Sequence, residues 1–246
     1  MITAIIQARL SSKRLPKKLI MKIAQKTLLE NLFLQLSYSQ QIEKKIIATT
    51  TDPIDDEIEK IANSINLRCF RGNPQNVLDR YYKCAKLFDS KTIVRISGDA
   101  PLIDPKIVDK TIEYYKKNNF DYVSNFFRRT FPIGTEVEIF SFKTLEKCWK
   151  NAQKPYEKEH VTPFIYEHPE LFNIGHIENS ENLSHLHWTV DTIEDFNLVK
   201  SISQKIKNRP ILMNQILDLL QNEPDLVKIN ESIDPFVGFK KSKMGH

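Results

Sequence analysis

The strongest constraint on the fold is the order in which apolar runs and amphipathic stretches alternate along the first half of the chain. Strands that alternate with helices at this spacing are joined by right-handed crossovers and form a mostly parallel sheet. The pattern predicts strands at 2–8, 44–50, 67–70, 92–97 and 121–125, and helices at 27–38, 54–66, from 74 or 75 to about 88, and 105–117. The predicted fold class is therefore α/β in three layers, with helices on both faces of a central sheet.

The regular alternation ends after residue 125. TEVEIFSF (135–142) alternates apolar and polar residues, as expected of a half-exposed antiparallel strand, and predicts a small antiparallel insertion. Further along, we expect helices at 142–151, 157–167 and 192–206 and short strands near 172–177 and 186–190. No regular structure is assigned to the polar, proline-containing tail after about residue 223.

Length and composition indicate one domain at 1–223 and a tail at 224–246. The 36 basic and 31 acidic residues give a net charge of +5, which is too small to indicate a nucleic-acid partner by itself. Three widely spaced cysteines argue against a disulfide framework or a zinc site, and we expect a cytoplasmic protein. No stretch reaches the ~18 apolar residues of a membrane span, so no membrane partner is expected.

A cluster of cations and hydroxyls follows the first predicted strand, in IIQARLSSKRLPKKLI (5–20). Ligands of doubly wound sheets bind beside this loop, where turn amides, hydroxyls and guanidinium groups can hold phosphate oxygens. The loop lacks G-x-x-x-x-G-K-[ST], and the chain lacks G-x-G-x-x-G, so neither a P-loop nor a dinucleotide fingerprint is present. We interpret the loop as a polyphosphate site; a solvated basic loop is the alternative.

Two acidic residues follow other predicted strands. Asp99 ends RISGD, and Asp191 ends HWTVD, each at the expected ligand edge of the sheet. Carboxylates there can hold Mg²⁺ on nucleotide phosphates, although Asp99 could equally form a turn and Asp191 cap a helix. Together with the basic loop, they indicate metal-assisted chemistry on phosphate.

At these residues the chain resembles the sugar-acid cytidylyltransferases, which include the acylneuraminate and KDO (3-deoxy-manno-octulosonate) enzymes. The shared motifs are A-R-x-x-S-x-R-L-P-x-K near the start, G-D-x-P-L-I and V-D-T-x-E-D-F. The resemblance is greatest to the spore coat polysaccharide biosynthesis protein F branch, through RGNPQNVLDRYY (71–82), PIGTEVEIFS (132–141) and EHVTP (159–163). It covers residues 1 to about 206.

The resemblance implies a nucleotide-diphospho-sugar transferase (Rossmann-like) fold and transfer of CMP from CTP to a sugar or sugar acid, with release of pyrophosphate. It implies Mg²⁺ as cofactor, held by Asp99 and Asp191, with Arg14, Lys18 and Asp99 as catalytic residues. Such enzymes serve the biosynthesis of surface glycans and often dimerise. We therefore expect a homodimer in which 126–180 contributes to the subunit contact and to sugar binding.

The resemblance also implies two sets of binding residues. The expected nucleotide-binding residues are Ala8, Arg9, Ser11, Ser12, Arg14, Lys18, Arg71, Gly72, Asp79, Arg80 and Ser97. The expected sugar-binding residues are Glu136, Glu138, Glu159 and His160. Glu136 and Glu138 would share one strand face, but a solvated face explains them equally well, and His160 could be a cap or a core residue.

The chain departs from the family pattern at Ser11, where glycine is usual, at His187, and at Ile193, where proline is usual. Three other functions therefore stay open. The same fold could use GTP or UTP, or the departures could leave a nucleotide-sugar-binding protein without transferase activity. A nucleic-acid binder is the weakest alternative, because the cations gather in one turn without aromatic interleaving.

Overall fold

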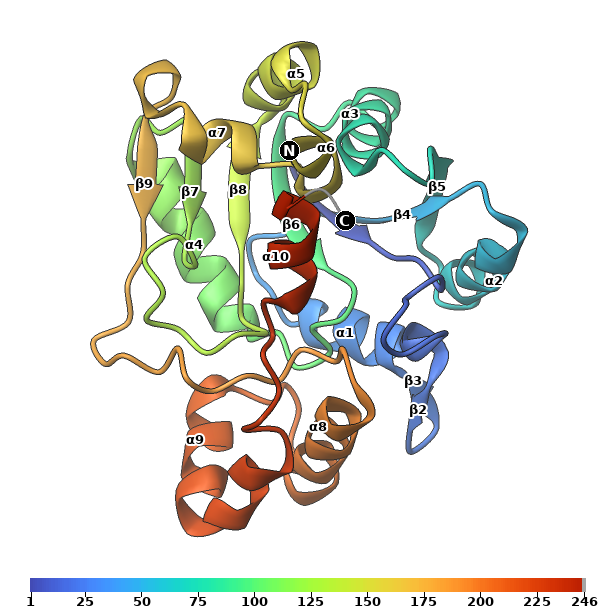
Figure 1. Cartoon of the computed structure of the whole chain (residues 1–246), viewed down its shortest axis with the longest axis vertical. Helices are drawn as coiled ribbons and strands as arrows, with labels where there is room; N and C mark the ends of the chain where they lie inside the picture. The colour runs from blue at the N-terminus through green and yellow to red at the C-terminus, as the bar shows by residue number, and fades with distance from the viewer. Residues whose placement is uncertain (245–246) are drawn as a thin grey trace.

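The computed structural model describes residues 1–244 of the chain and is built on a seven-stranded sheet with the order β5-β4-β1-β6-β8-β7-β9 (Figure 1). The strands of this sheet are β1 (Ile2–Gln7), β4 (Lys44–Thr50), β5 (Arg68–Gly72), β6 (Thr92–Ser97), β7 (Tyr122–Ser124), β8 (Glu138–Ser141) and β9 (Ile174–His176). β8 is antiparallel to both of its neighbours, whereas the other adjacent pairs are parallel. A separate hairpin pairs β2 (Lys22–Ile23) with β3 (Lys26–Thr27).

Helices cover both faces of the sheet, as the alternation in the sequence predicts. Successive side chains of a strand point to opposite faces, so Ala4 and Ile6 pack in one core cluster and Ile5 in another. The first cluster lies under α1 (Leu28–Leu36), α2 (Asp56–Ser64) and α4 (Pro105–Lys117). The second lies under α3 (Val77–Leu87), α5 (Phe142–Asn151) and α7 (Pro163–Glu167), and α6 (Pro155–His160) packs against α3. The three-layer α/β prediction is confirmed.

A third apolar cluster lies outside these two layers, around Trp188, Val199 and Ile216. It packs α8 (Ile193–Lys205), α9 (Met213–Asn222) and the 3-10 helix η4 (Pro224–Ile229), which form the lower part of the molecule in Figure 1. The remaining elements are the 3-10 helices η1 (Lys18–Ile20), η2 (Pro53–Asp55) and η3 (Pro169–Leu171), and α10 (Val237–Met244). None of the helices described in residues 1–244 is long and apolar enough to cross a membrane.

Four expectations after residue 125 were wrong. The strand expected at 135–142 is β8, which is antiparallel as predicted but lies between β6 and β7 with Glu138, Ile139 and Phe140 buried, so it is not half-exposed. The helix expected at 157–167 is divided into α6 and α7 at Val161, whose φ of 73° is incompatible with a continuous helix. Near 186–190 there is one isolated bridge, between Ile133 and His187, instead of a strand.

The fourth error concerns the C-terminal segment. The sequence predicts no regular structure after about residue 223, yet this segment contains η4 and α10, and α9 precedes it in a stretch for which the sequence also predicts no element. The sequence from Asn230 onward lacks a clear apolar period, and no residue of α10 is buried. The position of α10 therefore depends on contacts with distant parts of the chain, and hydrophobic periodicity in the sequence does not predict such contacts.

Candidate active site

The site lies at the edge of the sheet where the parallel strands β1 and β6 end. The two strands are in register, with Gln7 opposite Ser97, and the Gly98 amide donates to the Gln7 carbonyl at 3.0 Å. A Cβ atom on Gly98 would lie 2.6 Å from that carbonyl oxygen, so only glycine allows this approach. The loops that follow the two strands are thereby held against each other.

The basic loop after β1 is folded back on itself and anchored from beneath. The Leu10 amide donates to Asp55 Oδ1 at 2.7 Å, and the Thr50 hydroxyl donates to the other oxygen of the same carboxylate. Asp55 has no exposed surface. The Lys17 amide donates to the Leu10 carbonyl at 3.0 Å, and Lys17 itself has a φ of 58°. This turn directs the next residue, Lys18, back toward the sheet.

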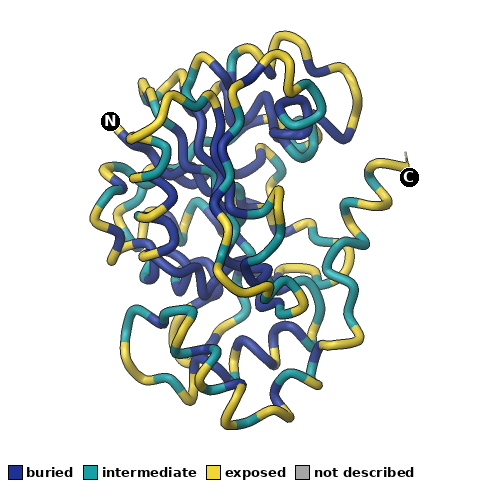
Figure 2. Tube along the Cα trace, turned by 90° about the vertical axis from the view of Figure 1, so that its left-hand side faces the viewer, coloured by how far each residue is buried: buried dark blue, intermediate teal, exposed yellow. Residues whose placement is uncertain are grey.

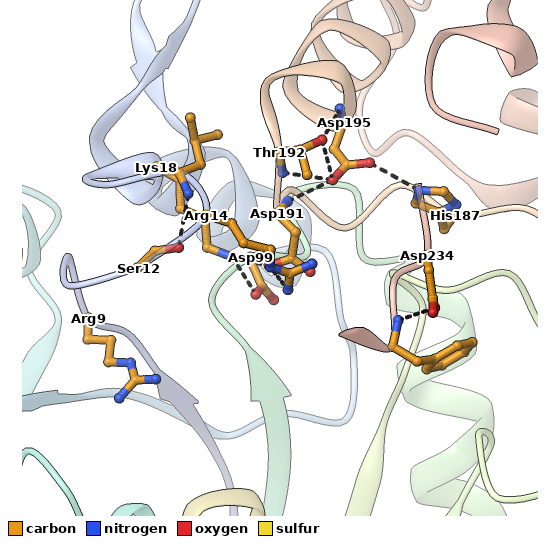
Figure 3. Close-up of polar contacts among 12 residues, drawn as sticks. Arg9, Ser12, Arg14, Lys18, Asp99, His187, Asp191, Thr192, Asp195 and Asp234 are labelled. Atoms are coloured by element: carbon orange, nitrogen blue, oxygen red, sulfur yellow. Dashed lines mark hydrogen bonds and ion pairs between the residues drawn. The ribbon is translucent and has the colours of Figure 1, made fainter. Parts of the chain in front are cut away.

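Lys18 is the centre of the site. Its Nζ atom lies 2.8 Å from Asp99 Oδ2 and 2.8 Å from Asp191 Oδ1, and Arg14 Nη2 lies 2.9 Å from the same Asp191 oxygen (Figure 3). The Lys18 side chain is 8% exposed. The basic loop and the two acids, which are far apart in the sequence, therefore converge on one point.

The charges at this point stabilise one another. Burial disfavours the Lys18 ammonium, but the carboxylates of Asp99 and Asp191 outweigh it and raise the pKa of Lys18 above its ordinary 10.5. Burial likewise works against the Asp99 carboxylate, but the charge and hydrogen bond of Lys18 keep its pKa below the ordinary 3.8. Near pH 7 the Lys18 ammonium therefore faces an ionised Asp99 carboxylate.

Asp191 is held in place by the first turn of α8. Asp195 Oδ2 accepts from the amides of Asp191 at 3.0 Å and Thr192 at 2.8 Å, while its Oδ1 lies 3.0 Å from His187 Nε2 (Figure 3). Asn230 Nδ2 donates to Asp195 Oδ1 at 2.9 Å. Although burial opposes it, this set of donors lowers the pKa of Asp195 to about 2. His187, one of the departures from the family pattern, belongs to this support of the Asp191 loop.

A cavity of about 730 Å³ opens beside these residues, within the range of small-molecule sites. Cationic side chains outnumber carboxylates in its lining, so the site favours an anion. The lining cations are Arg9, Lys13, Arg14, Lys18, Arg80, Arg95 and Lys241, and the lining carboxylates are Asp99, Glu159 and Asp191.

Two of these cations lie under the cavity, Arg80 buried and Arg95 half-buried. Arg80 is 1% exposed, donates to the Asn73 carbonyl at 3.0 Å and leaves its Nε without a partner among the residues described. Burial lowers the pKa of Arg80, and no carboxylate in the described chain pairs with it. Arg95 pairs with Glu138, and this carboxylate offsets the free-energy cost of keeping the Arg95 charge away from water. Arg80 therefore carries a charge that an anionic ligand would neutralise.

Most of the residues expected from the sequence line this cavity. They are Ala8, Arg9, Ser11, Ser12, Arg14, Lys18, Arg80, Ser97, Asp99, Glu159, His160 and Asp191. Five expected residues are absent from the lining: Arg71, Gly72, Asp79, Glu136 and Glu138. The structure brings the first set together and gives the second set other contacts.

The three nucleotide-binding candidates outside the lining have structural contacts instead. Arg71 pairs with two residues of α2, Asp56 at 2.6 Å and Glu59 at 3.0 Å. Asp79 pairs with Lys83 at 2.9 Å and accepts from Trp149 Nε1 at 3.0 Å, so it joins α3 to α5. Gly72 is in van der Waals range of Arg80, because a Cβ atom there would lie 3.1 Å from Arg80 Cγ. These contacts do not support a direct role in nucleotide binding.

The two glutamates expected to share a strand face do not do so. Glu136 precedes β8 and accepts from the Gly134 amide at 2.6 Å, in a turn where Gly134 has a φ of 106°. Glu138 is 2% exposed and accepts from the hydroxyls of Tyr122, at 2.8 Å, and Thr162. Glu138 thus fixes Arg95 under the cavity, and the contact with sugar expected of both residues is not supported by their positions.

The cavity also contains residues that sequence reasoning missed. Arg95 could have been identified as a cation inside an otherwise apolar strand, TIVRIS, where a buried charge needs a partner or a ligand. The residues contributed by the C-terminal segment, among them Gly238, Phe239, Lys241 and Ser242, had no comparable signal.

The family model for cytidylyltransferases matches residues 3–233 of the chain. The chain belongs to the cytidylyltransferase family. An uncharacterised protein of Methanocaldococcus jannaschii, MJ1063, is 40% identical over 234 residues, covering 94% of this chain and 95% of that protein. The spore coat polysaccharide biosynthesis protein SpsF of Bacillus subtilis is 30% identical over 239 residues, covering 94% and 98%. The resemblance read from the motifs is confirmed.

Solved structures agree with this cytidylyltransferase assignment. A cytidylyltransferase from Leptospira borgpetersenii superposes with a TM-score of 0.89 at 32% identity, covering 92% of this chain and 96% of that one. A CMP-2-keto-3-deoxy-manno-octonic acid synthetase in complex with CTP superposes with a TM-score of 0.65 at 15% identity, covering 83% and 99%. The second likeness shows the shared fold alone.

The cytidylyltransferase site has donors that suit a magnesium ion. Asp99 and Asp191 both reach the Lys18 ammonium, so their oxygens already converge on a single positive charge. Within residues 1–244 no group of three or more acidic, histidine or cysteine side chains could hold a metal by itself. Mg²⁺ usually takes one or two carboxylates and completes its shell with water and substrate phosphates, which this pair would allow.

Proposed function

We propose that this cytidylyltransferase transfers CMP from CTP to a sugar or sugar acid, with release of pyrophosphate, in the biosynthesis of a surface polysaccharide. The observation that carries the proposal is the convergence of Lys18 and Arg14 with Asp99 and Asp191 at one end of a cation-rich cavity. Triphosphate binding needs cations, and metal binding needs carboxylates, and both are present at the same point.

The basic loop would bind the triphosphate. Arg14 presents a guanidinium group that matches phosphate oxygens, and Lys18 contributes a buried ammonium. Ser11 and Ser12 line the cavity beside them. These groups would stabilise the negative charge that develops on pyrophosphate as it leaves. The anchor at Asp55 holds the loop before the nucleotide arrives, which limits the reorganisation that binding requires.

Asp99 and Asp191 would hold Mg²⁺. When bound, the ion would neutralise phosphate oxygens and orient the reacting groups. Lys18 lies between the two carboxylates in the present structure, and phosphate oxygens would provide it with an alternative partner in the complex. Asp195 would act through Asp191, because it accepts from the amide of that residue.

The reaction itself is a substitution at the α-phosphorus of CTP. The sugar hydroxyl oxygen forms a bond to phosphorus, the bond between that phosphorus and the bridging oxygen of pyrophosphate breaks, and the hydroxyl proton is lost. His160 is the candidate acceptor for this proton. Burial lowers its pKa below 6.5, so the ring is neutral near pH 7, and its Nε2 has no partner among the described residues.

The sugar would bind on the side of the cavity formed by α6. Glu159 and His160 end this helix and line the cavity, and Glu159 Oε1 lies 3.8 Å from Arg9 Nη2. A carboxylate paired with arginine can accept hydrogen bonds from sugar hydroxyls, while the arginines nearby can bind a sugar carboxylate. Both a neutral sugar and a sugar acid are therefore compatible with this side.

The expected homodimer stays a prediction. The region expected at the subunit contact begins with three phenylalanines, of which Phe131 is buried in the core of one chain and Phe126 packs on Tyr166. Phe127 is 45% exposed and stacks on His176. A dimer contact at this region would therefore depend on Phe127, and light scattering of the wild type and of Phe127→Ser would test it.

Pyrophosphate release tests the proposed function. The protein is incubated with Mg²⁺, one of CTP, GTP or UTP, and one of a panel of sugars and sugar acids. The proposal predicts release with CTP and one sugar class only. Release with GTP or UTP instead would assign another nucleotide to the same fold, and CTP binding without release for any sugar would favour a protein that binds without transferring.

A further inference from the structure

The C-terminal helix α10 lies across the mouth of the cavity. The chain leaves the lobe of α8 and α9, passes η4 and returns upward to the sheet, so that α10 lies in front of β6 in Figure 1. Figure 2 shows the same segment standing away from the buried core, with only intermediate and exposed residues along it. Six residues between 235 and 242 belong to the cavity lining: Pro235, Val237, Gly238, Phe239, Lys241 and Ser242.

One face of α10 spans both halves of the site. Gly238, Lys241 and Ser242 are three and four residues apart and so lie on the same side of the helix. A Cβ atom on Gly238 would lie 3.5 Å from Arg14 Nη2, beside the triphosphate-binding loop. At the other end, the Ser242 hydroxyl donates to Glu159 Oε2 at 2.6 Å.

Phe239 continues the contact on the sugar side of the cavity. Its ring meets the ring of His160 edge-on, with 4.9 Å between the centroids. Phe239 also belongs to the cavity lining, as His160 does. The helix therefore lies beside one proposed triphosphate residue, Arg14, and contacts both residues proposed for the sugar side.

The lysines of α10 differ in their partners. Lys240 pairs with Asp234 at 2.6 Å, and Lys243 pairs with Glu167 at 3.3 Å. Lys241 makes no ion pair with any residue in the described part of the chain, and it lines the cavity on the same face as Gly238. Its ammonium is therefore available to an anion bound there.

The docking of α10 is weak. An isolated helix of eight residues is unstable in water, and none of the residues of α10 is buried. Its side-chain contacts with distant parts of the chain are the Phe239–His160 ring contact, the Ser242–Glu159 hydrogen bond, and Lys243, which lies over the Tyr156 ring and pairs with Glu167. An ion pair of this exposed kind contributes about 0–1 kcal/mol. A segment held in this way can open at little cost and can be stabilised by any ligand that it also contacts.

We propose that α10 is a lid of the nucleotide site and that Lys241 is a further triphosphate-binding residue carried by this lid. The proposal rests on the proposed function, because it takes the polyphosphate of CTP as the anion. Binding of the anion adds a partner for Lys241 in the closed position only, so it favours closure. Closure in turn covers the cavity and limits the access of water to the reacting phosphate.

Hydrogen exchange tests the lid. Amide exchange of residues 237–244 is measured in the full chain alone, with CTP and Mg²⁺, and with inorganic triphosphate. The proposal predicts that both anions slow exchange in this segment, by about tenfold at saturation. Unchanged exchange in 237–244 while the loop at 8–18 becomes protected would show that the nucleotide binds without α10 and would overturn the proposal.

The matched substitutions Lys241→Ala and Lys240→Ala test whether Lys241 binds the triphosphate. We expect Lys241→Ala to raise the Kd for CTP about five- to tenfold in calorimetry, and the Kd for inorganic triphosphate similarly. Lys240→Ala removes an equal charge from the outer face and should leave both constants within about twofold. Equal increases in Kd for the two variants would mean that only the net charge of the protein matters and would contradict the role of Lys241. An unchanged Kd in Lys241→Ala would show that Lys241 does not bind the triphosphate.

The two proposals can fail separately. If the wild-type protein binds inorganic triphosphate through Lys241 but does not discriminate CTP from other nucleotides, the proposed function is contradicted and the proposal that α10 is a lid stands. If the wild-type protein binds CTP and releases pyrophosphate, and Lys241→Ala has the same Kd for CTP, the proposed function stands and the proposal that α10 is a lid is contradicted.

Discussion

Asp55 offers the sharpest test of how the phosphate-binding loop is held. Its carboxylate lies under the loop with no exposed surface, and it accepts from the Leu10 amide at 2.7 Å and from the Thr50 hydroxyl. Asp55→Ala removes both acceptors. The Leu10 amide then stays buried without an acceptor, and the Thr50 hydroxyl, which still accepts from the Asp52 amide at 3.1 Å, has no acceptor for its own proton, unless the loop moves and lets water in.

The expected cost follows from these two contacts. A hydrogen bond to a charged group contributes about 1.5–3 kcal/mol, so the free energy of unfolding should fall by about 3 kcal/mol or more in Asp55→Ala. Asp55→Asn keeps one acceptor oxygen for the Leu10 amide and should lose about half as much. Domains of this kind are stable by about 5–15 kcal/mol, so both variants should still fold at room temperature.

Urea denaturation followed by circular dichroism measures the loss, and Asp56→Ala is the matched control. Asp56 is the next residue, but its side chain is 54% exposed and pairs with Arg71 at the surface, so its removal should cost about 0–1 kcal/mol. Asp55→Ala should also weaken CTP binding more than Asp56→Ala does, since only Asp55 holds the loop. Equal losses of stability in the two alanine variants would refute this account of the loop.

Three further predictions concern the cavity. Arg14→Ala should raise the Kd for CTP by about tenfold or more in calorimetry, because a charge-assisted contact to phosphate is lost, and an unchanged Kd would exclude this contact. Arg80→Met should weaken CTP binding without lowering the urea midpoint, because it removes a buried charge that no carboxylate in the described chain pairs with; a large loss of stability would instead give Arg80 a structural role. Burial lowers the pKa of His160 below 6.5, so the folded state binds fewer protons than the unfolded state. The free energy of unfolding should therefore fall as the pH drops from about 7.5 to about 5.5. In His160→Gln this part of the decline should disappear, and a variant with the same pH profile as the wild type would contradict the lowered pKa.

The sheet and the centre of the site could be predicted because both depend on local pattern. The runs at 2–7, 44–50 and 92–97 are apolar and β-branched, and each is a strand of the sheet. Parallel strands place their carboxyl ends at one edge, so Asp99 and the basic loop had to meet there. The family motif added Asp191, which follows an extended segment outside the sheet.

The remaining features depend on tertiary contacts that have no local signal. Glu138 looks like a polar residue on a strand face, yet β8 is buried on both faces and the carboxylate neutralises Arg95. Arg71 and Asp79 lie in a family motif, but each has found a partner on a neighbouring helix. The polar sequence of α10 does not indicate a helix that returns to the cavity, because the contacts that hold it involve Arg14, Glu159 and His160.

The most direct measurement of the central claim is the rate of pyrophosphate release from CTP and Mg²⁺ by Asp99→Asn, compared with the wild type and the sugar that the panel identifies. Asparagine removes the charge that faces Lys18. Because it keeps the size of the side chain, the far-ultraviolet circular dichroism spectrum should be unchanged. If the acids and cations converge on a magnesium–triphosphate complex, turnover should fall by about a hundredfold or more. A variant that releases pyrophosphate at the wild-type rate would contradict that convergence.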